Sequence, residues 1–336
     1  MKRLIGFFFP IIFITILSVN LTACSQTDFF RNQTITIIIP NGPGGGIDTY
    51  ARTIAPFLQK YLPQSKVVVT NVTEKGGLAG KNQVYQAQPD GLTLGFDHIS
   101  SALLAEWEGA PGVAYKTADF SYIGRINFES HVLAVSPKSG LNNMQDIVKS
   151  KKIKMGFSGV GTNDYYVAMI TAHVLGYEVE PQRNFLSASD ASFACVKGSV
   201  DGILFSDSSI HAQMDENTIK PVVVFSQSRL ASLPQVPTIF EVVPSEKHAM
   251  VQTLVQIYAL DRTMFGPPGM DPSRLKALRK AFDQAVNDPD FLNTLFILNR
   301  PVNYLNGTDV EELIKKIYSN ENEIKPLVQM ISKGSP

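Results

Sequence analysis

Hydrophobic and polar residues follow two different periods along the chain. Residues 34–39 are mostly β-branched and stop at Pro40, which is typical of a buried strand. From residue 47 to residue 61 the apolar side chains recur every three or four positions, which predicts a helix. A strand (66–70), a loop (76–80), a short helix (81–87) and another strand (93–96) follow. This order predicts an α/β fold with a parallel sheet, which binds ligands beyond the carboxyl ends of its strands.

The middle third of the chain repeats this pattern and predicts a second α/β unit. The expected helices are 144–149, 165–175 and 191–197, and the expected strands are 132–135, 154–157, 184–186, 202–205 and 221–225. Farther on, Asp271 and Pro272 are typical of a helix start. The tail is predicted to be helical at 309–317 and 321–330, with a break or kink at Pro326.

The first 23 residues differ from the rest of the chain. Lys2 and Arg3 precede an apolar run from Leu4 to Val19, which at about 16 residues is short for a membrane span. Residues 1–23 are therefore interpreted as a cleaved secretory signal, and the alternative is an uncleaved anchor helix.

The end of this segment, Leu21-Thr22-Ala23-Cys24, resembles a bacterial lipobox. That resemblance implies that Cys24 becomes the first mature residue and carries a lipid on its sulfur. The polar residues that follow, as far as position 33, are expected to form a tether between lipid and fold.

The amino-acid composition further limits the classes of protein to which this chain can belong. The 336 residues include 30 basic and 30 acidic side chains, and 44% are hydrophobic. This length suggests two domains with cores of their own. The zero net charge argues against nucleic-acid binding, which needs a basic face. Without Lys2 and Arg3 the mature chain has 28 basic and 30 acidic side chains. Cys195 lies in an apolar helical stretch and is expected to be a core residue, not a nucleophile.

A glycine-rich loop at residues 40–48 joins the first strand to the first helix. Unpaired amides at a helix start, with glycines that permit close approach, can hold a carboxylate or a phosphate; the alternative is a tight turn. Nucleotide motifs do not fit. Ile47 stands where a dinucleotide-binding loop needs glycine, and Gly80-Lys81-Asn82 lacks the hydroxyl of a P-loop.

A second loop between a strand and a helix, at residues 157–164, adds hydroxyl groups to the same arrangement. Two such loops on separate domains suggest a clamp around a small ligand, as in periplasmic binding proteins. Asp207 would face the same cleft or cap the helix that follows it. His98 would line the cleft or lie on a surface loop.

The sequence contains no complete motif of a catalytic or metal-binding site. The run from Gly156 to Val160 lacks the last glycine of a nucleophile elbow. The five histidines do not have the spacing of zinc ligands. We therefore expect no metal and no cofactor.

Several short motifs occur in order along the mature chain. They are Pro40-Asn41-Gly42-Pro43-Gly44-Gly45-Gly46-Ile47-Asp48-Thr49-Tyr50-Ala51-Arg52, Asn71 with Gly76-Gly77-x-x-Gly80, Pro89-Asp90-Gly91-x-Thr93-Leu94, Gly159-Val160-Gly161-Thr162, Gly198-Ser199-Val200-Asp201, Leu233-Pro234-Gln235-Val236-Pro237-Thr238 with Glu241, and Pro267-Pro268-Gly269. Together they resemble the substrate-binding receptors of tripartite tricarboxylate transporters, also called Bug-type receptors.

This resemblance implies a two-domain fold of the periplasmic-binding-protein type II class, the Venus flytrap, with two crossover strands. The crossings are expected near 124–132 and 224–230. Domain 1 would then comprise 34–126 and 229–336, and domain 2 would comprise 127–228.

The resemblance also implies that two loops of the first domain hold a ligand carboxylate through amides and ordered waters, while a loop of the second domain closes over the rest. Together with the residues placed by their position after strands, the expected ligand-binding residues are Pro43, Gly44, Gly45, Gly46, Asp48, Gly76, Gly77, Leu78, Gly80, His98, Ser100, Ser158, Gly159, Gly161, Thr162 and Asp207.

Two departures from the family concern the ligand. Tyr165 stands where many members have histidine, and Phe185-Leu186-Ser187 stands where they have Tyr-Lys-Gly. The second lobe is therefore less cationic, which favours a monoacid, or an acid with a polar or aromatic tail. Residues 244–262 are longer than in the family, and the sequence suggests no function for them.

The sequence thus predicts a non-enzymatic receptor that is exported, anchored to a membrane by lipid, and faces the periplasm or the cell exterior. It would deliver a small organic carboxylate to integral-membrane transporter subunits, as a monomer and without nucleic acid. One alternative is a ligand-sensing lipoprotein of the same fold that is coupled to a signalling partner. An exported hydrolase is a third hypothesis, but no complete catalytic constellation supports it.

Overall fold

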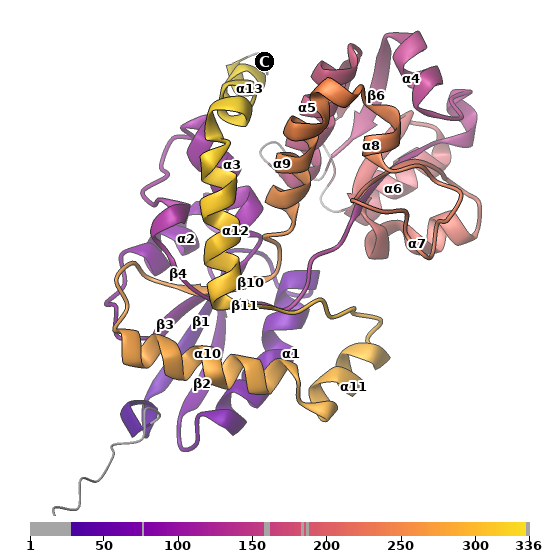
Figure 1. The fold of residues 1–336 in the computed structure, drawn as a ribbon. Coiled ribbons are helices and arrows are strands. Elements are labelled where there is room, and N and C mark those ends of the chain that lie inside the picture. The colour runs from indigo at the N-terminus through magenta and orange to yellow at the C-terminus, as the bar shows by residue number, and fades with distance from the viewer. Residues whose placement is uncertain (1–27, 76, 158–161, 183–184, 186–187, 334–336) are drawn as a thin grey trace, which may run out of the picture.

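The computed structural model describes residues 28–333, except 76, 158–161, 183–184 and 186–187. These residues form two lobes that lie side by side, each built around one β-sheet with helices on both faces (Figure 1). The mixed α/β architecture with two sheets agrees with the sequence-based prediction.

The first lobe begins with three strand–helix units: β1 (Thr34–Ile39), α1 (Gly46–Tyr61), β2 (Lys66–Asn71), α2 (Leu78–Tyr85), β3 (Thr93–Asp97) and α3 (Ile99–Glu108). Strand β1 pairs in parallel with β2 on one side and β3 on the other. Its side chains alternate between two hydrophobic cores: Ile35, Ile37 and Ile39 lie in one and Ile38 in the other. Because both faces of the strand are covered, its sequence is apolar almost throughout.

Three further strands complete this sheet: β4 (Ser121–Arg125), β10 (Thr263–Gly266) and β11 (Leu305–Asn306). The strand order is β11-β4-β10-β3-β1-β2. Strand β10 is antiparallel to both β3 and β4, so the expectation of a purely parallel sheet is wrong here. The reason is that β10 enters from the second lobe and therefore runs in the opposite direction. The expectation is also wrong for the second lobe, where residues 131–135 run antiparallel to both neighbouring strands.

The second lobe contains a five-stranded sheet in the order β7-β6-β8-β5-β9. Its strands are β5 (His131–Val135), β6 (Lys152–Gly156), β7 (Glu178–Gln182), β8 (Gly202–Ser206) and β9 (Lys220–Phe225). Its helices are α4 (Met144–Ser150), α5 (Asn163–Leu175), α6 (Ala188–Lys197), α7 (Asp207–Asp215) and α8 (Ile239–Val242). The strand expected at 184–186 falls largely outside the described residues, and the observed strand is β7.

Residues 126–130 make the first crossing between the lobes. The second crossing comes later than the expected 224–230. Val224 forms a bridge with Thr238, and Leu233 and Val236 belong to the core beneath the second sheet. The chain returns through α9 (His248–Tyr258) and reaches the first sheet only at β10. Apolar packing of the residues after β9 keeps this segment on the second lobe. The domain boundary predicted at 229 therefore comes too early in the chain.

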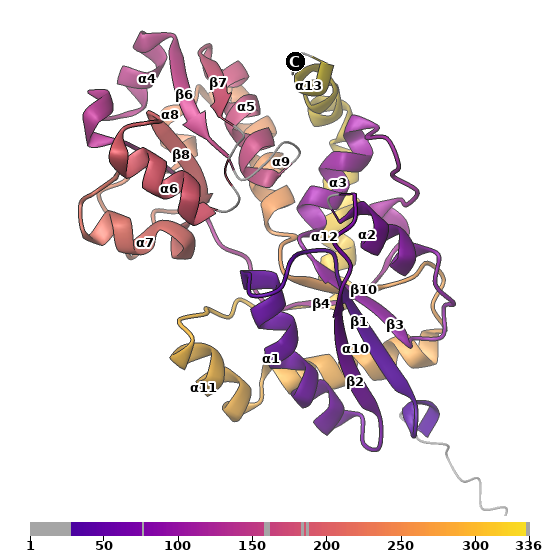
Figure 2. The same ribbon diagram turned by 180° about the vertical axis from the view of Figure 1, so that it is seen from behind.

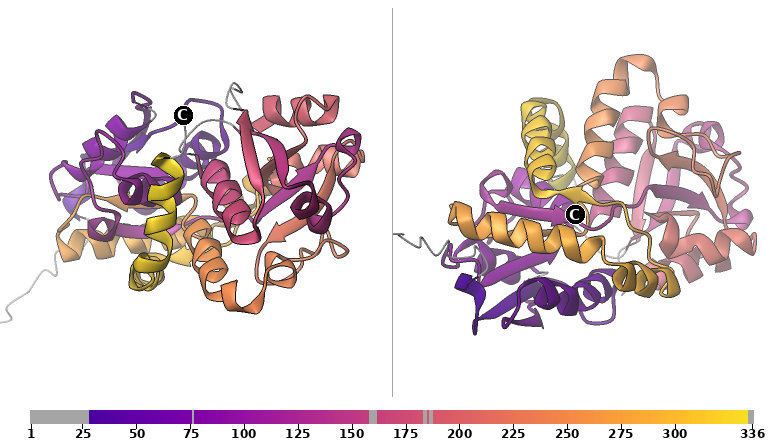
Figure 3. Two further views of the ribbon diagram at one scale, coloured as in Figure 1. Left: turned by 90° about the horizontal axis from the view of Figure 1, so that it is seen from above. Right: turned by 60° about the horizontal axis from the view of Figure 1, so that its bottom comes forward.

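The C-terminal part of the chain consists of α10 (Pro272–Val286), α11 (Pro289–Ile297), α12 (Gly307–Ser319) and α13 (Glu321–Lys333). Helix α10 packs against α1, as the view from below also shows (Figure 3). Helix α13 continues through Pro326 without the predicted break. Its apolar face, including Ile324 and Val328, is buried, and this packing offsets the hydrogen bond that proline cannot donate.

The predicted tether ends earlier than residue 33. Phe30 is fully buried in the core of the first lobe, and the guanidinium of Arg274 lies 3.5 Å from the ring centre of Phe29. Residues 29 and 30 are therefore part of the fold.

The two lobes also touch through the C-terminal helix. Helix α13 packs against α3 of the first lobe and against α5 of the second, and one hydrophobic core continues across both lobes. The Tyr166 hydroxyl donates to Glu108 across the same contact. Ligand access must therefore come from another side of the molecule.

Candidate functional site

Three helices of the first lobe begin at the same edge of its sheet. Helices α1, α2 and α3 start directly after the carboxyl ends of β1, β2 and β3 or after a short loop (Figure 2). No side chain caps the first turn of α1 or α2. The amides at the start of α1 have no side-chain acceptor. At the start of α2 the amides of Gly77, Leu78 and Ala79 donate to backbone carbonyls of residues 73–75, so this helix contributes mainly the positive potential of its dipole. This edge of the sheet has the geometry and the potential to hold an anion.

Asp48 fixes the shape of the β1–α1 loop. Its Oδ2 accepts a hydrogen bond from the Gly44 amide at 2.9 Å, and its Oδ1 accepts one from Asn71 at 2.9 Å. Arg52 Nε lies 3.0 Å from the same carboxylate. Burial alone would raise the pKa of Asp48, but the hydrogen bonds from Arg52, Gly44 and Asn71 lower it overall. Asp48 is therefore ionised and turned toward its own loop.

The β2–α2 loop packs directly on the β1–α1 loop. A Cβ atom on Gly77 would lie 2.3 Å from the Pro40 carbonyl oxygen, and one on Gly80 would lie 2.9 Å from the Val72 carbonyl oxygen. Leu78 is the first residue of α2 and is half-buried. Pro43, Gly44 and Gly45 are exposed at the tip of the first loop. Gly76 lies outside the described residues.

A buried ion pair supports these loops, and the sequence did not predict it. Lys81 Nζ lies 3.0 Å from Asp97 Oδ2, and Asp97 Oδ1 accepts a hydrogen bond of 2.6 Å from Asn41 in the first loop. The only sequence signal was an aspartate at a strand end and a lysine after a glycine loop.

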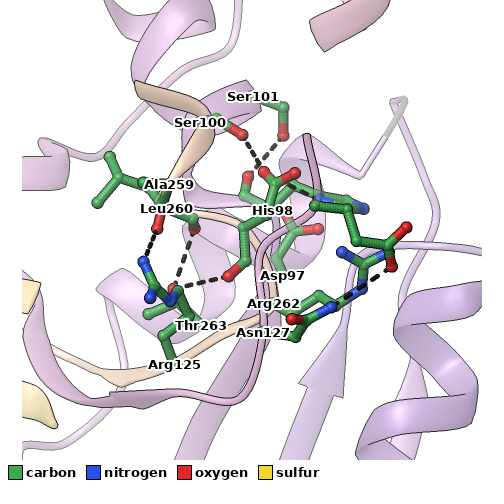
Figure 4. Close-up of polar contacts among 12 residues, drawn as sticks. Asp97, His98, Ser100, Ser101, Arg125, Asn127, Ala259, Leu260, Arg262 and Thr263 are labelled. Atoms are coloured by element: carbon green, nitrogen blue, oxygen red, sulfur yellow. Dashed lines mark hydrogen bonds and ion pairs between the residues drawn. The ribbon is translucent and has the colours of Figure 1, made fainter. Parts of the chain in front are cut away.

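His98 and Ser100, both labelled in Figure 4, contact Asp261, a buried residue at the return crossing. His98 Nδ1 lies 3.1 Å from Asp261 Oδ1, and the Ser100 hydroxyl donates to the same oxygen at 2.5 Å. Burial acts to raise the pKa of Asp261, but His98, His131 and Arg262 together lower it to about 2. His98 is thus partly exposed and anchored to a carboxylate. It is not an isolated surface residue.

Arg262 follows in the same segment and is 5% exposed. Its Nη2 lies 2.8 Å from Glu129 of the first crossing, and its guanidinium lies 5.1 Å from the ring centre of Tyr50 on α1. Glu129 also accepts hydrogen bonds from the amide and hydroxyl of Ser208 in the second lobe. Residues 261 and 262, which had no predicted function, therefore join both lobes at the hinge. Two adjacent charges after an apolar helix were the only sequence signal.

Asp207 lies in the second lobe, directly after β8. It is the first residue of α7, and the N-cap position belongs to Ser206, so the alternative capping role is wrong by one residue. Asp207 lines a hinge cavity of about 520 Å³ together with Glu129, Ser208 and residues of α9. None of the described glycine-loop residues lines this cavity.

The loop expected to close over the ligand lies mostly outside the described residues, including Ser158, Gly159 and Gly161. Thr162 is described: it precedes α5 and is half-buried. Tyr165 is buried and packs edge-on against Phe157.

Cys195 is fully buried, and burial raises the pKa of its thiol to about 12, which confirms a core residue. Within the described ranges, no group of three or more His, Cys, Asp or Glu side chains could hold a metal ion. No helix in the described part of the chain is long and apolar enough to cross a membrane.

Comparison with known proteins places this geometry in a family. Residues 50–332 match the family model of the tripartite tricarboxylate transporter family receptor. A UPF0065 protein of Bordetella pertussis is 24% identical over 326 residues, which cover 94% of this chain and 95% of that protein.

Two solved structures share the fold. A TctC solute-binding protein from Polaromonas has a TM-score of 0.68 at 20% identity, covering 89% of this chain and 98% of its own. MatC from Rhodopseudomonas palustris, solved with bound malate, has a TM-score of 0.67 at 20% identity, covering 87% of this chain and 99% of its own. The predicted two-domain Venus-flytrap fold is thereby confirmed. The chain belongs to the tripartite tricarboxylate transporter family of receptors, which bind solutes and are not enzymes.

Proposed function

We propose that this protein is an exported receptor that captures a small organic carboxylate between its two lobes and delivers it to a membrane transporter of the tripartite tricarboxylate type. The observation that carries the proposal is the meeting of the N-termini of α1 and α2, neither of which has a side-chain cap, at one edge of the first sheet. Amides and helix dipoles there favour a carboxylate without a basic surface. The malate bound to MatC supports the same chemical class.

In this proposal the first lobe anchors the carboxylate through the loops at 43–46 and 76–78. Asp48 and Gly80 hold these loops in shape. His98 and Ser100 support the base of the cleft through Asp261. From the second lobe, Ser158, Gly159, Gly161 and Thr162 close over the remainder of the ligand.

Closure is the step that a transporter can recognise. A ligand that touches both lobes stabilises the closed state only by its higher affinity for that state. The segments at 126–130 and 259–262 are the natural hinges, because they connect the two sheets. Asp207, which lines the hinge cavity, would face the ligand from the second lobe.

Membrane attachment through Cys24 is part of the proposal. Because the fold already includes Phe29 and Phe30, at most a few residues separate a lipid on Cys24 from the first lobe. Such a short link would keep the receptor within about 20 Å of the membrane surface. Replacing Cys24 with serine should release the mature protein from membranes into the soluble fraction.

The role of the ligand-binding loop can be tested with two glycine-to-valine variants. Gly45→Val should abolish binding and leave the fold intact, because its Cβ would point into the cradle and the nearest other atom lies 3.8 Å away. Gly42→Val is the matched control, since Gly42 lies in the same loop with open space around it. Thermal-shift titrations with acetate, benzoate, malate and citrate would measure binding.

Wild-type protein that none of these acids stabilises would contradict the proposed function. Equal binding by Gly45→Val and wild type would contradict the placement of the cradle. A largest shift with citrate would contradict the preference for a monoacid, which rests on the weakly cationic second lobe.

A further inference from the structure

We propose that the guanidinium groups of Arg262 and Arg300 bind the ligand carboxylate directly, beside the first turn of α1. This inference rests on the proposed function and adds a charged anchor to the backbone amides. It makes these two arginines determinants of affinity for carboxylate ligands.

Arg262 is a buried side chain with unused donors. Glu129 contacts Nη2, while Nε and Nη1 are buried and have no hydrogen-bond partner among the described residues. A buried donor without an acceptor is costly, because it has lost water and gained nothing in return. An anion placed against the free atoms of this guanidinium would remove that cost.

Arg300 approaches the same place from a different part of the chain. A Cβ atom built on Gly46, the first residue of α1, would lie 3.9 Å from Arg300 Nη1 and 4.0 Å from Arg262 Nη2. Two cations therefore stand beside the positive end of a 16-residue helix. Cations are unfavourable at this end of a helix, and an anion is favourable.

The surrounding acids are already engaged. Asp48 pairs with Arg52, Asp97 with Lys81, and Asp261 with His98, while Glu129 serves Arg262. No ion pair with Arg300 occurs among the described residues. One carboxylate from outside would supply a counterion for Arg300.

The chemistry fits a carboxylate in particular. A guanidinium presents its N–H groups in a planar fork that matches the two oxygens of a carboxylate. The ring of Tyr50 lies under Arg262 and limits its rotation, so the fork is held in place before ligand arrives. Because the group is buried, solvent and salt screen its charge only weakly.

Gly46→Asp provides the sharpest test, because it places an internal carboxylate beside both arginines. We expect the unliganded variant to unfold about 2 °C or more above wild type and to lose carboxylate binding. Gly46→Asn is the matched control: it has the same size and no charge, so it should not raise the unfolding temperature. A Gly46→Asp variant that is no more stable than Gly46→Asn would overturn the proposal.

Variants of Arg262 and of its counterion Glu129 should change carboxylate affinity in opposite directions. Arg262→Gln should weaken binding of the best carboxylate in the panel by about 10-fold to 100-fold. Glu129→Gln removes the competing charge and should strengthen that binding. Calorimetric titration measures both, and circular dichroism verifies folding.

Failure of this inference is distinguishable from failure of the proposed function. If wild type binds carboxylates and Arg262→Gln and Arg300→Gln bind them equally well, the arginines are not the anchor, although the receptor function stands. If inorganic phosphate stabilises the wild type more than every carboxylate does, the assigned ligand class is wrong.

Discussion

Lys81 and Asp97 form an ion pair of 3.0 Å in which both side chains are more than nine-tenths buried. The pair joins α2 to the end of β3, and Asp97 also holds Asn41 of the first glycine loop. The loops that we propose to bind ligand are therefore supported by a charge pair beneath them, and not only by their own glycines.

Removing one partner of this pair should strongly destabilise the folded protein. Lys81→Met leaves Asp97 as a buried charge without its counterion, and we expect a loss of about 3–5 kcal/mol in the free energy of unfolding. Urea denaturation measures this change.

The double variant Lys81→Met, Asp97→Asn should recover most of the loss, because no charge is then left unpaired. Lys152→Met is the surface control, since Lys152 pairs with Glu180 at 2.8 Å with both side chains about half exposed. It should have a much smaller effect. Equal losses for Lys81→Met and Lys152→Met would contradict the role given to the buried pair.

Gly77 is required for close packing of the two loops as well as for its backbone conformation. Gly77 and Gly109 have φ values of 83° and 76°, so alanine is strained at both positions, at about 1 kcal/mol. Only at Gly77 would the new Cβ meet another atom, the Pro40 carbonyl oxygen at 2.3 Å; at Gly109 nothing lies within 4 Å.

Gly77→Ala should therefore destabilise the protein clearly more than Gly109→Ala and should also weaken carboxylate binding. Urea midpoints and thermal-shift titrations would measure the two effects. Unchanged carboxylate binding by Gly77→Ala would show that this loop is not part of the binding site.

His131 should make stability depend on pH. Burial lowers its pKa from 6.5 to about 4, and its ring stacks on Tyr258 at 4.4 Å. Between these two pH values the unfolded chain binds a proton that the folded protein does not. Stability from this group is therefore complete above pH 6.5 and is lost as the pH falls toward 4, by about 3 kcal/mol in all.

His131→Phe keeps an aromatic ring against Tyr258 and removes the titration. Its stability should change less than that of wild type between pH 6.5 and 4 in urea titrations. Parallel pH profiles of the two proteins would show that His131 is not the responsible group. The contribution of Asp261 is separate, because its pKa of about 2 places its loss below pH 4.

The sequence by itself determined the features that depend on neighbouring residues. The apolar run of β1, the helical period of α1 and the glycines between them follow from local backbone geometry, so their positions were predicted to within one or two residues. The order of short motifs also indicated the family, which the comparison confirmed.

Only the tertiary structure decided which distant residues meet. Ser100 and Asp261 are 161 positions apart, and no local period could bring them together. The antiparallel entry of β10, the late return crossing and the pairing of Arg262 with Glu129 likewise depend on how the second lobe docks on the first. Local periodicity reflects the geometry of one segment, whereas ion pairs and crossings reflect the packing of many segments at once. The glycine loops can therefore be recognised in the sequence, whereas the ion pairs that support them can be recognised only in the folded structure.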